Sequence, residues 1–232
     1  MPEFLFLVRS YNEAERIGST IDSIFSAGYS RVLVVDDGST DATESLLSGR
    51  NDIFYLRHPF NRGGGAALET GFEFVRRNAQ SFGITHVVTF DADGQMDIAD
   101  MENFLSCMRE RPQVDVWLGS RSLGSASHMP ILRRIVLWGG RLFTWGFSGV
   151  RLSDAHNGYR VLSVKAIRSI RLTMDGMEYA SELIDELVRN QLSYAETPVN
   201  IRYDEYSLSK GQKNLNALRI VSRMIYKRFF DS

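Results

Sequence analysis

FDADGQMD, residues 90–97, begins with the last residue of the apolar run His86–Phe90 and places two acids, Asp91 and Asp93, one residue apart. Like charges this close repel each other, and they coexist most easily when a cation lies between them. A run of β-branched and aromatic residues that stops near a glycine is typical of a buried strand. The stretch therefore predicts a central strand whose carboxyl end carries a functional pair of acids.

Strand-like and helix-like segments alternate outward from this stretch through the first half of the chain. The apolar runs predict strands over Phe4–Val8, Val32–Val35, Ile53–Leu56, His86–Phe90 and Val114–Leu118. The segments between them predict helices over Glu13–Ala27, Asp41–Ser48, Gly65–Gln80 and Ile98–Arg111. This alternation indicates an α/β fold with a mostly parallel sheet covered by helices on both faces.

The second half is less regular. We expect helices over Met129–Gly149 and Glu178–Asn190, a strand over Pro198–Tyr203, and a basic amphipathic helix over Gln212–Phe230. Neither an internal repeat nor a linker is evident. The expected organisation is one domain over residues 1–210 followed by a C-terminal helical segment, 211–232, that contacts a membrane surface or a second subunit.

The composition limits the classes of function. Of the 232 residues 44% are apolar and 24% are charged, and the net charge of -1 gives no field that favours nucleic acid. A single cysteine, Cys107, excludes an internal disulfide and is typical of a reducing compartment. We expect neither a signal peptide nor a transmembrane span, because no apolar stretch reaches the roughly 18 residues that a span needs. The expected location is the cytoplasm.

Asp91, Asp93 and Gln95 together form a candidate metal site. Residues i and i+2 of a strand point to the same side, so two carboxylates and the Gln95 carbonyl can present oxygens to one cation. Mg²⁺ and Mn²⁺ prefer such ligands, usually with substrate phosphates completing the shell. An EF-hand is disfavoured because Met96 stands where that loop needs glycine. The plain alternative is a pair of solvated turn aspartates.

Polar clusters follow the other predicted strands, where parallel sheets bind their ligands. In VVDDGST, Asp36 or Asp37 can accept hydrogen bonds from a nucleoside, whereas the plain alternative is a turn in which Ser39 or Thr40 caps the next helix. Tyr11 and Glu13, at the end of the first strand, could contact the same nucleoside. In NRGGGAA the small residues around Gly64 let a backbone approach a ligand closely, or else only pack a helix on the sheet.

Taken in order, the motifs SYNEAERI, VVDDGSTDAT, NRGGGAALETG, FDADGQ, GSR and DAHNGYR resemble the family 2 glycosyltransferases with the GT-A fold. The pattern looks closest to the dolichol-phosphate and polyprenyl-phosphate mannosyltransferases. The resemblance, over residues 4 to 210, implies a nucleotide-sugar donor and a Mg²⁺ or Mn²⁺ ion. It further implies a nucleoside held by Tyr11, Glu13 and Asp36 or Asp37, a metal held by Asp91, Asp93 and Gln95, and phosphates faced by Arg121 and Arg202.

The sequence departs from that branch at two places. Arg9-Ser10 stands where a Pro-Thr pair usually precedes YNE, and YSLSKG, residues 206–211, replaces the usual Gly-x-Ser-Lys. The second departure puts the role of Lys210 in doubt. The transmembrane helices that some relatives carry are also not expected here.

The expected reaction inverts the anomeric carbon, but the sequence leaves the acceptor open. A sugar hydroxyl needs a general base, for which Glu182, Glu178 and Asp154 are candidates, whereas a lipid phosphate is already ionised and needs none. Two other classes compete: a nucleotidyltransferase that makes nucleotide sugars, and a non-catalytic nucleotide-sugar-binding protein. The expected partners are the donor, a lipid-linked acceptor, the membrane surface at its cytoplasmic face, and a second copy in a homodimer.

Overall fold

The structure is a computed structural model and describes residues 2–127, 145 and 149–203. Within this part of the chain one seven-stranded sheet has the order β3-β2-β1-β4-β6-β5-β7. Its strands are β1 (Phe4–Ser10), β2 (Val32–Asp36), β3 (Phe54–Arg57), β4 (His86–Asp91), β5 (Val116–Ser127), β6 (Arg160–Ser163) and β7 (Tyr194–Arg202). The expected α/β fold with a mostly parallel sheet is confirmed.

The half of the sheet made by β3, β2, β1 and β4 is parallel throughout. Its strands are apolar on both faces because helices cover both faces, so they appear in the sequence as continuous hydrophobic runs. The register pairs Arg9 with Asp91 and Ser10 with Asp36. The carboxyl ends of β1, β2 and β4 therefore meet at one edge of the sheet.

The other half differs from the expected pattern. Strand β6 was not predicted; it runs antiparallel between β4 and β5, and its first residue, Arg160, pairs with Thr89 and Leu118. This reversal brings the start of β6 to the edge where β4 ends. Strand β7 pairs in parallel with β5 and begins at Tyr194, four residues before the predicted start at Pro198.

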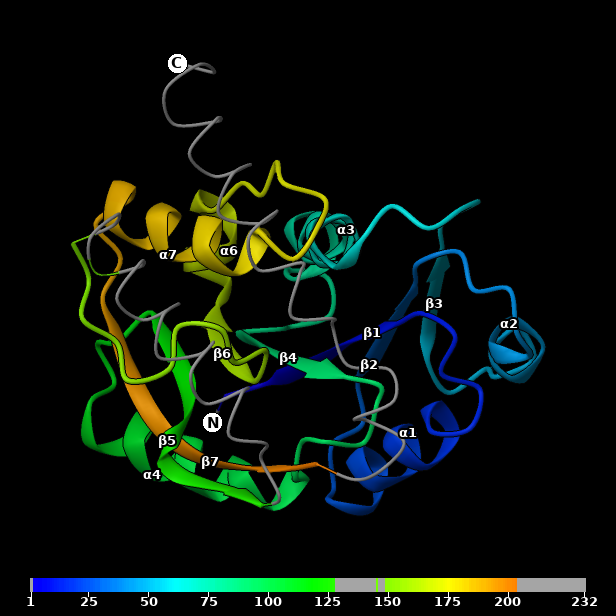
Figure 1. Ribbon diagram of the computed structural model, residues 1–232, viewed down its shortest axis with the longest axis horizontal. Helices are drawn as coiled ribbons and strands as arrows, with labels where there is room; N and C mark the ends of the chain where they lie inside the picture. Colours follow the sequence, from blue (N-terminus) through cyan, green and yellow to red (C-terminus); the bar gives the residue numbers. More distant parts are fainter. Residues whose placement is uncertain (1, 128–144, 146–148, 204–232) are drawn as a thin grey trace.

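Helices cover both faces of the sheet (Figure 1). Along one face lie α3 (Gly64–Asn78), α6 (Val164–Ser169) and α7 (Tyr179–Arg189), and along the other lie α1 (Ile17–Ser26) and α4 (Met101–Glu110). The short η1 (Ile98–Asp100) leads into α4, and α2 (Thr43–Leu47) lies beside the β3 edge. Helix α1 begins four residues later than predicted, and α6 was not predicted.

Two hydrophobic cores result, one on each face. Successive side chains of β1 point to opposite faces of the sheet. Leu5 and Leu7 pack toward α3 and α7, whereas Phe6 and Val8 pack toward α1 and α4. Gly71 of α3 lies against the Leu7 side chain, so the helix approaches the sheet closely. This packing fixes the strand ends that carry the polar motifs.

Two predicted helices fall largely or wholly outside the described residues. Of the helix over Met129–Gly149 only Trp145 and Gly149 are described, and the segment 211–232 lies outside entirely. Within the described part of the chain no helix has the length and apolar character that crossing a membrane requires.

Candidate active site

The polar motifs gather at the edge where the parallel strands end. Asp91 is the last residue of β4, and the turn after it carries Asp93, Gly94 and Gln95. Gly94 has a φ of 74°, a left-handed conformation that glycine adopts without strain. The turn folds back, and the Gln95 carbonyl accepts a 2.9 Å hydrogen bond from the Arg202 backbone N–H. The guanidinium of Arg202 pairs with Asp97 at the end of the same turn.

Asp91 and Asp93 interact with each other through their charges. Burial and the negative charge of Asp91 raise the pKa of Asp93 to about 7. One Asp93 oxygen accepts a 3.0 Å hydrogen bond from the Gln95 backbone N–H, which stabilises the ionised form only in part. Asp93 is therefore the less stabilised of the two carboxylates in its ionised form.

The pair remains a candidate site for a divalent ion. No group of three histidine, cysteine or acidic side chains that could hold a metal exists among the residues that the structure describes. Mg²⁺ and Mn²⁺ are commonly held by one or two carboxylates together with substrate phosphates, which is the ligand set that Asp91 and Asp93 can offer. Gly158 leaves room beside them, because a Cβ there would lie 2.7 Å from an Asp91 oxygen.

The two acids after β2 hold loops. Asp36 is fully buried and accepts hydrogen bonds from the Ser39 backbone N–H (2.9 Å) and the Tyr55 hydroxyl (3.0 Å). Asp37 accepts from His58 Nδ1 (2.7 Å) and from the backbone N–H groups of residues 62 and 63 (3.0 and 2.7 Å). Asp37 thus fixes the start of the glycine-rich segment.

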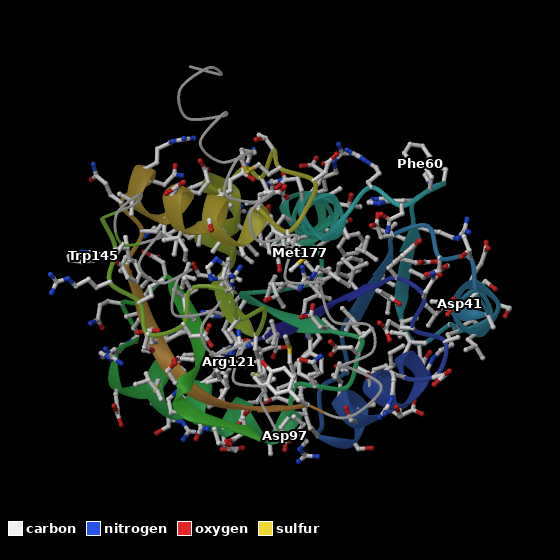
Figure 2. The ribbon with its side chains drawn as sticks, in the orientation of Figure 1. Asp41, Phe60, Asp97, Arg121, Trp145 and Met177 are labelled. Carbon is white, nitrogen blue, oxygen red and sulfur yellow. The ribbon has the colours of Figure 1, made fainter. Side chains whose placement is uncertain are left out.

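The first strand end supplies an exposed ring. Tyr11 is 43% exposed, so a ligand can reach its ring. Glu13 is anchored through its backbone, with its N–H on Thr43 Oγ1 at 3.1 Å and its carbonyl accepting from Arg16 and Ile17 at the start of α1. Figure 2 shows Asp41 and Phe60 at the outer edge of this side of the molecule.

The loop that contains Asp175 packs against the glycine-rich segment. The backbone N–H groups of Gly65 and Ala66, at the start of α3, donate to the Asp175 carbonyl at 2.8 and 3.2 Å. A Cβ on Gly65 would overlap the Met174 carbonyl oxygen and lie 2.9 Å from Tyr179 Cβ. Close packing is therefore one reason for these glycines. Gly64 borders the site instead, since a Cβ there would lie 3.3 Å from Arg9 Nη1.

Glu182, on α7, holds the loop that packs on Gly65. Its carboxylate is buried and accepts from the Thr173 backbone N–H (3.0 Å), the Thr173 hydroxyl (2.7 Å) and the Met174 backbone N–H (2.9 Å). Figure 2 places Met177, from the same loop, over the middle of the molecule.

Arg121 belongs to a buried network at the end of the sheet. Its Nε donates to Asp154 at 2.5 Å and its Nη1 donates to the Tyr203 hydroxyl at 2.6 Å. The neighbouring turn is held by Glu196 of β7, which accepts from the Ser153 backbone N–H at 2.9 Å. Figure 2 shows Arg121 near the middle of the view.

Arg9 and Tyr179 were not predicted as site residues. The Arg9 guanidinium pairs with Asp91 and lies 4.9 Å from the centre of the Tyr179 ring, which Arg160 also approaches at 5.8 Å. Arg160 is 1% exposed and has no carboxylate partner among the described residues; burial lowers the pKa of its guanidinium. The one sequence signal for Arg9 is its position at the end of an apolar strand.

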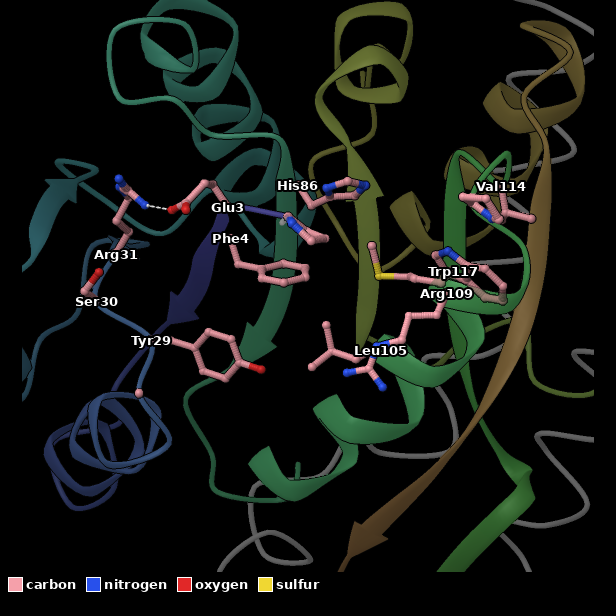
Figure 3. Close-up of a pocket in the computed structure, with 14 residues that line it drawn as sticks. Glu3, Phe4, Tyr29, Ser30, Arg31, His86, Leu105, Arg109, Val114 and Trp117 are labelled. Carbon is pink, nitrogen blue, oxygen red and sulfur yellow. Dashed lines mark hydrogen bonds and ion pairs between the residues drawn. The ribbon is translucent and has the colours of Figure 1, made fainter.

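A separate cavity of about 610 Å³ lies at the opposite ends of the strands (Figure 3). Its walls are mostly apolar and include Phe4, Tyr29, Leu105 and Trp117, with the Glu3–Arg31 ion pair at one side. None of the predicted site residues lines it, so the polar carboxyl-end site and this cavity are distinct.

Comparisons with known proteins show the family of the chain. The family model of glycosyl transferase family 2 matches residues 6–171. An uncharacterised protein of Methanocaldococcus jannaschii is 32% identical over 98% of this chain and 93% of its own length. The UDP-N-acetylglucosamine–dolichyl-phosphate N-acetylglucosaminyltransferase of Methanococcus voltae is 24% identical over 94% of this chain and 93% of its own.

Among solved structures, glucosyl-3-phosphoglycerate synthase from Mycobacterium tuberculosis, in complex with Mn²⁺ and uridine-diphosphate-glucose, has a TM-score of 0.69. It is 18% identical, and the likeness covers 97% of this chain and 76% of that one, which shows a shared fold. The resemblance found in the motifs and the expected class of enzyme are confirmed. This chain belongs to glycosyl transferase family 2 and is a glycosyltransferase.

Proposed function

We propose that the protein transfers a sugar from a nucleotide-sugar donor to a lipid-linked acceptor at the membrane surface, with inversion and with Mg²⁺ or Mn²⁺. The observation that carries the proposal is the pair Asp91 and Asp93 at the carboxyl edge, where burial and the charge of Asp91 raise the pKa of Asp93. The Methanococcus voltae relative, by its name, uses UDP-N-acetylglucosamine and dolichyl phosphate. The Mycobacterium tuberculosis neighbour binds Mn²⁺ and uridine-diphosphate-glucose.

The predicted metal-binding and donor-binding residues each have a role in this scheme. Asp91, Asp93 and Gln95 would hold the metal ion, which when bound stabilises the negative charge of the leaving diphosphate. Tyr11 stacks on the base, and Asp36 or Asp37, with Glu13, binds the nucleoside. Gly64 lets the donor approach the backbone at the start of α3. The donor phosphates lie toward Arg121 and Arg202, whose cations draw them to this edge.

The candidate general bases are buried or already bonded to other groups, which favours an acceptor that needs no base, such as a phosphate. Glu182 is bonded to Thr173 and Met174, and Asp154 is paired with Arg121. Glu178 is also buried, at 4% exposure. A lipid phosphate, whose second pKa is about 6, attacks without losing a proton to a base. Its oxygen forms the new bond to the anomeric carbon, and the nucleoside diphosphate leaves from the opposite face with the electrons of the broken bond.

The test is a donor screen with product identification. The protein is incubated with Mn²⁺, polyprenyl phosphate and, in turn, UDP-, GDP-, dTDP- and CDP-sugars. Released nucleoside diphosphate together with a glycosylated lipid supports the proposal. Released pyrophosphate would indicate nucleotidyl transfer, and binding without any product would indicate a non-catalytic protein; either result contradicts it.

A further inference from the structure

Arg9 occupies a tight slot at the centre of the candidate site. Its side chain is 11% exposed, pairs with Asp91 and stacks on the Tyr179 ring. The guanidinium fits this narrow slot because glycines line it. A Cβ on Gly158 would lie 3.1 Å from Arg9 Nη2, and a Cβ on Gly64 would lie 3.3 Å from Nη1. The guanidinium is thus held beside the acid that the donor's metal would need.

The hydrogen bonding of Arg9 is incomplete. A guanidinium carries five N–H donors, yet Arg9 Nε is buried without a partner among the described residues. The buried Asn157 Nδ2 next to Gly158 also lacks a partner there. A buried donor without an acceptor is costly, so Arg9 Nε beside the Asp91 carboxylate indicates that an acceptor enters from outside. Phosphate oxygens are acceptors that match a guanidinium in charge and shape.

The charges around Asp91 are also unbalanced. Two buried guanidinium groups, Arg9 and Arg160, lie against one ring, and Asp91 is the carboxylate that pairs with the first of them. A divalent ion binding to Asp91 would meet this fixed positive charge at short range, where repulsion is strong. A diphosphate arriving with the ion would remove that repulsion, because its oxygens can accept from Arg9.

We propose that Arg9 is the internal counter-ion of Asp91 in the ligand-free enzyme and becomes a ligand of the donor diphosphate when donor and metal bind together. This inference rests on the proposed function. Its consequence is strong coupling: metal alone binds weakly, and metal with a nucleoside diphosphate binds tightly. A purely structural role for the Arg9–Asp91 pair would stabilise the fold and leave this coupling unchanged.

The experiment measures Mn²⁺ binding by electron paramagnetic resonance, with and without UDP and, separately, GDP. In the wild type we expect Mn²⁺ affinity to rise by about tenfold or more when a nucleotide is present. Arg9→Met should bind Mn²⁺ alone about tenfold more tightly than the wild type and lose most of the coupling. Arg31→Met is the matched control, since it removes the Arg31–Glu3 pair (2.5 Å) at the far ends of the strands (Figure 3) and should behave as the wild type.

Arg9→Lys is the second variant and covers the case in which Arg9→Met does not fold. It keeps the charge without the planar fork, so Mn²⁺ alone should still bind weakly while the coupling falls. Wild-type coupling in the Met or Lys variant, or weaker binding of Mn²⁺ alone to Arg9→Met, would overturn the inference and leave the proposed function intact. If the wild type binds no Mn²⁺ with either nucleotide, the metal site itself is wrong and the inference fails with it.

Discussion

Arg9 and Asp91 are paired through both backbone and side chain. They lie opposite one another in the parallel register of β1 and β4, and their side chains form an ion pair at the end of those strands. The cation that the sequence requires beside Asp91 is thus supplied in part by the protein. Asp93 forms no ion pair with a described residue, and burial and the charge of Asp91 raise its pKa. In the site, Asp91 is neutralised by Arg9, whereas Asp93 has no ion-pair partner among the described residues.

This asymmetry predicts a pH dependence of metal binding. The pKa of Asp93 is raised from 3.8 to about 7, so its carboxyl favours folding below pH 3.8, and that contribution is lost as the pH rises through about 7. Mn²⁺ binds the ionised form and has to displace the proton below that pH. With UDP or GDP present, Mn²⁺ affinity should rise steeply, by up to about tenfold per pH unit, toward pH 7 and level off above it. Isothermal titration calorimetry at several pH values measures this, and a flat profile would show that Asp93 does not bind the metal.

Asp36 and Asp37 should affect both stability and donor binding. Replacing each with Asn weakens the bonds to the neighbouring loops, so both variants should melt earlier. For at least one of them the dissociation constant of the donor should rise about tenfold, equivalent to about 1.4 kcal/mol. Asp22→Asn is the control, because Asp22 lies on α1 with a 67% exposed side chain paired to Arg50. Donor affinities equal to that of the wild type in both variants would refute the nucleoside assignment.

The packing at Gly65 predicts a large effect of one methyl group. Gly65→Ala would force the Met174 carbonyl and the Tyr179 side chain apart, at a cost of about 1–3 kcal/mol in the free energy of unfolding. Gly18→Ala is the matched control: it lies in α1 with no heavy atom within 4 Å of its Cβ position, and it should be stabilising by about 0.5–1 kcal/mol. Chemical denaturation distinguishes the two. An equal effect of both substitutions would mean that the loop 173–176 does not pack on α3.

Glu182→Gln distinguishes a positioning role from a catalytic one. If Glu182 holds the loop, the variant loses about 1–3 kcal/mol of stability, and turnover with a lipid phosphate falls by less than about tenfold. If Glu182 is a general base, stability is retained and turnover falls by roughly 10²–10⁴-fold. Turnover and thermal unfolding measured on one preparation separate the two roles. A large loss of turnover at unchanged stability would contradict the phosphate acceptor.

The sequence predicts the parallel half of the sheet well because strands buried on both faces appear as continuous apolar runs. Strand β6 escapes prediction because it has four residues, of which Val161 and Leu162 alone are apolar. The start of β7 was missed for a similar reason, since Glu196 is a polar residue that holds the turn at Ser153 and the neighbouring Thr197 is polar but buried. Polar residues with internal partners hide a strand from its hydrophobic pattern.

The sequence predicts which residues gather at the candidate site, but it does not predict all of their contacts. Asp91, Asp93, Asp36 and Tyr11 follow apolar runs, so their gathering at one edge follows from parallel topology. The pairing of Arg9 with Asp91 depends on strand register, and the contact of Gly65 with Asp175 joins residues more than a hundred positions apart. No local pattern encodes either contact, so both required the structure.

The most direct test of the central claim follows a radiolabelled sugar from its nucleotide donor into polyprenyl phosphate, with wild-type protein and with Asp93→Ala. The wild type should yield a lipid product that mild acid hydrolyses, as a glycosyl phosphate does, with inverted anomeric configuration and one nucleoside diphosphate released per sugar. Asp93→Ala should fold normally and retain less than about a tenth of the turnover, because a lost metal ligand removes several kcal/mol of charge stabilisation. Retention of more than that, or a wild type that releases nucleoside diphosphate without forming an acid-labile lipid product, would contradict the account.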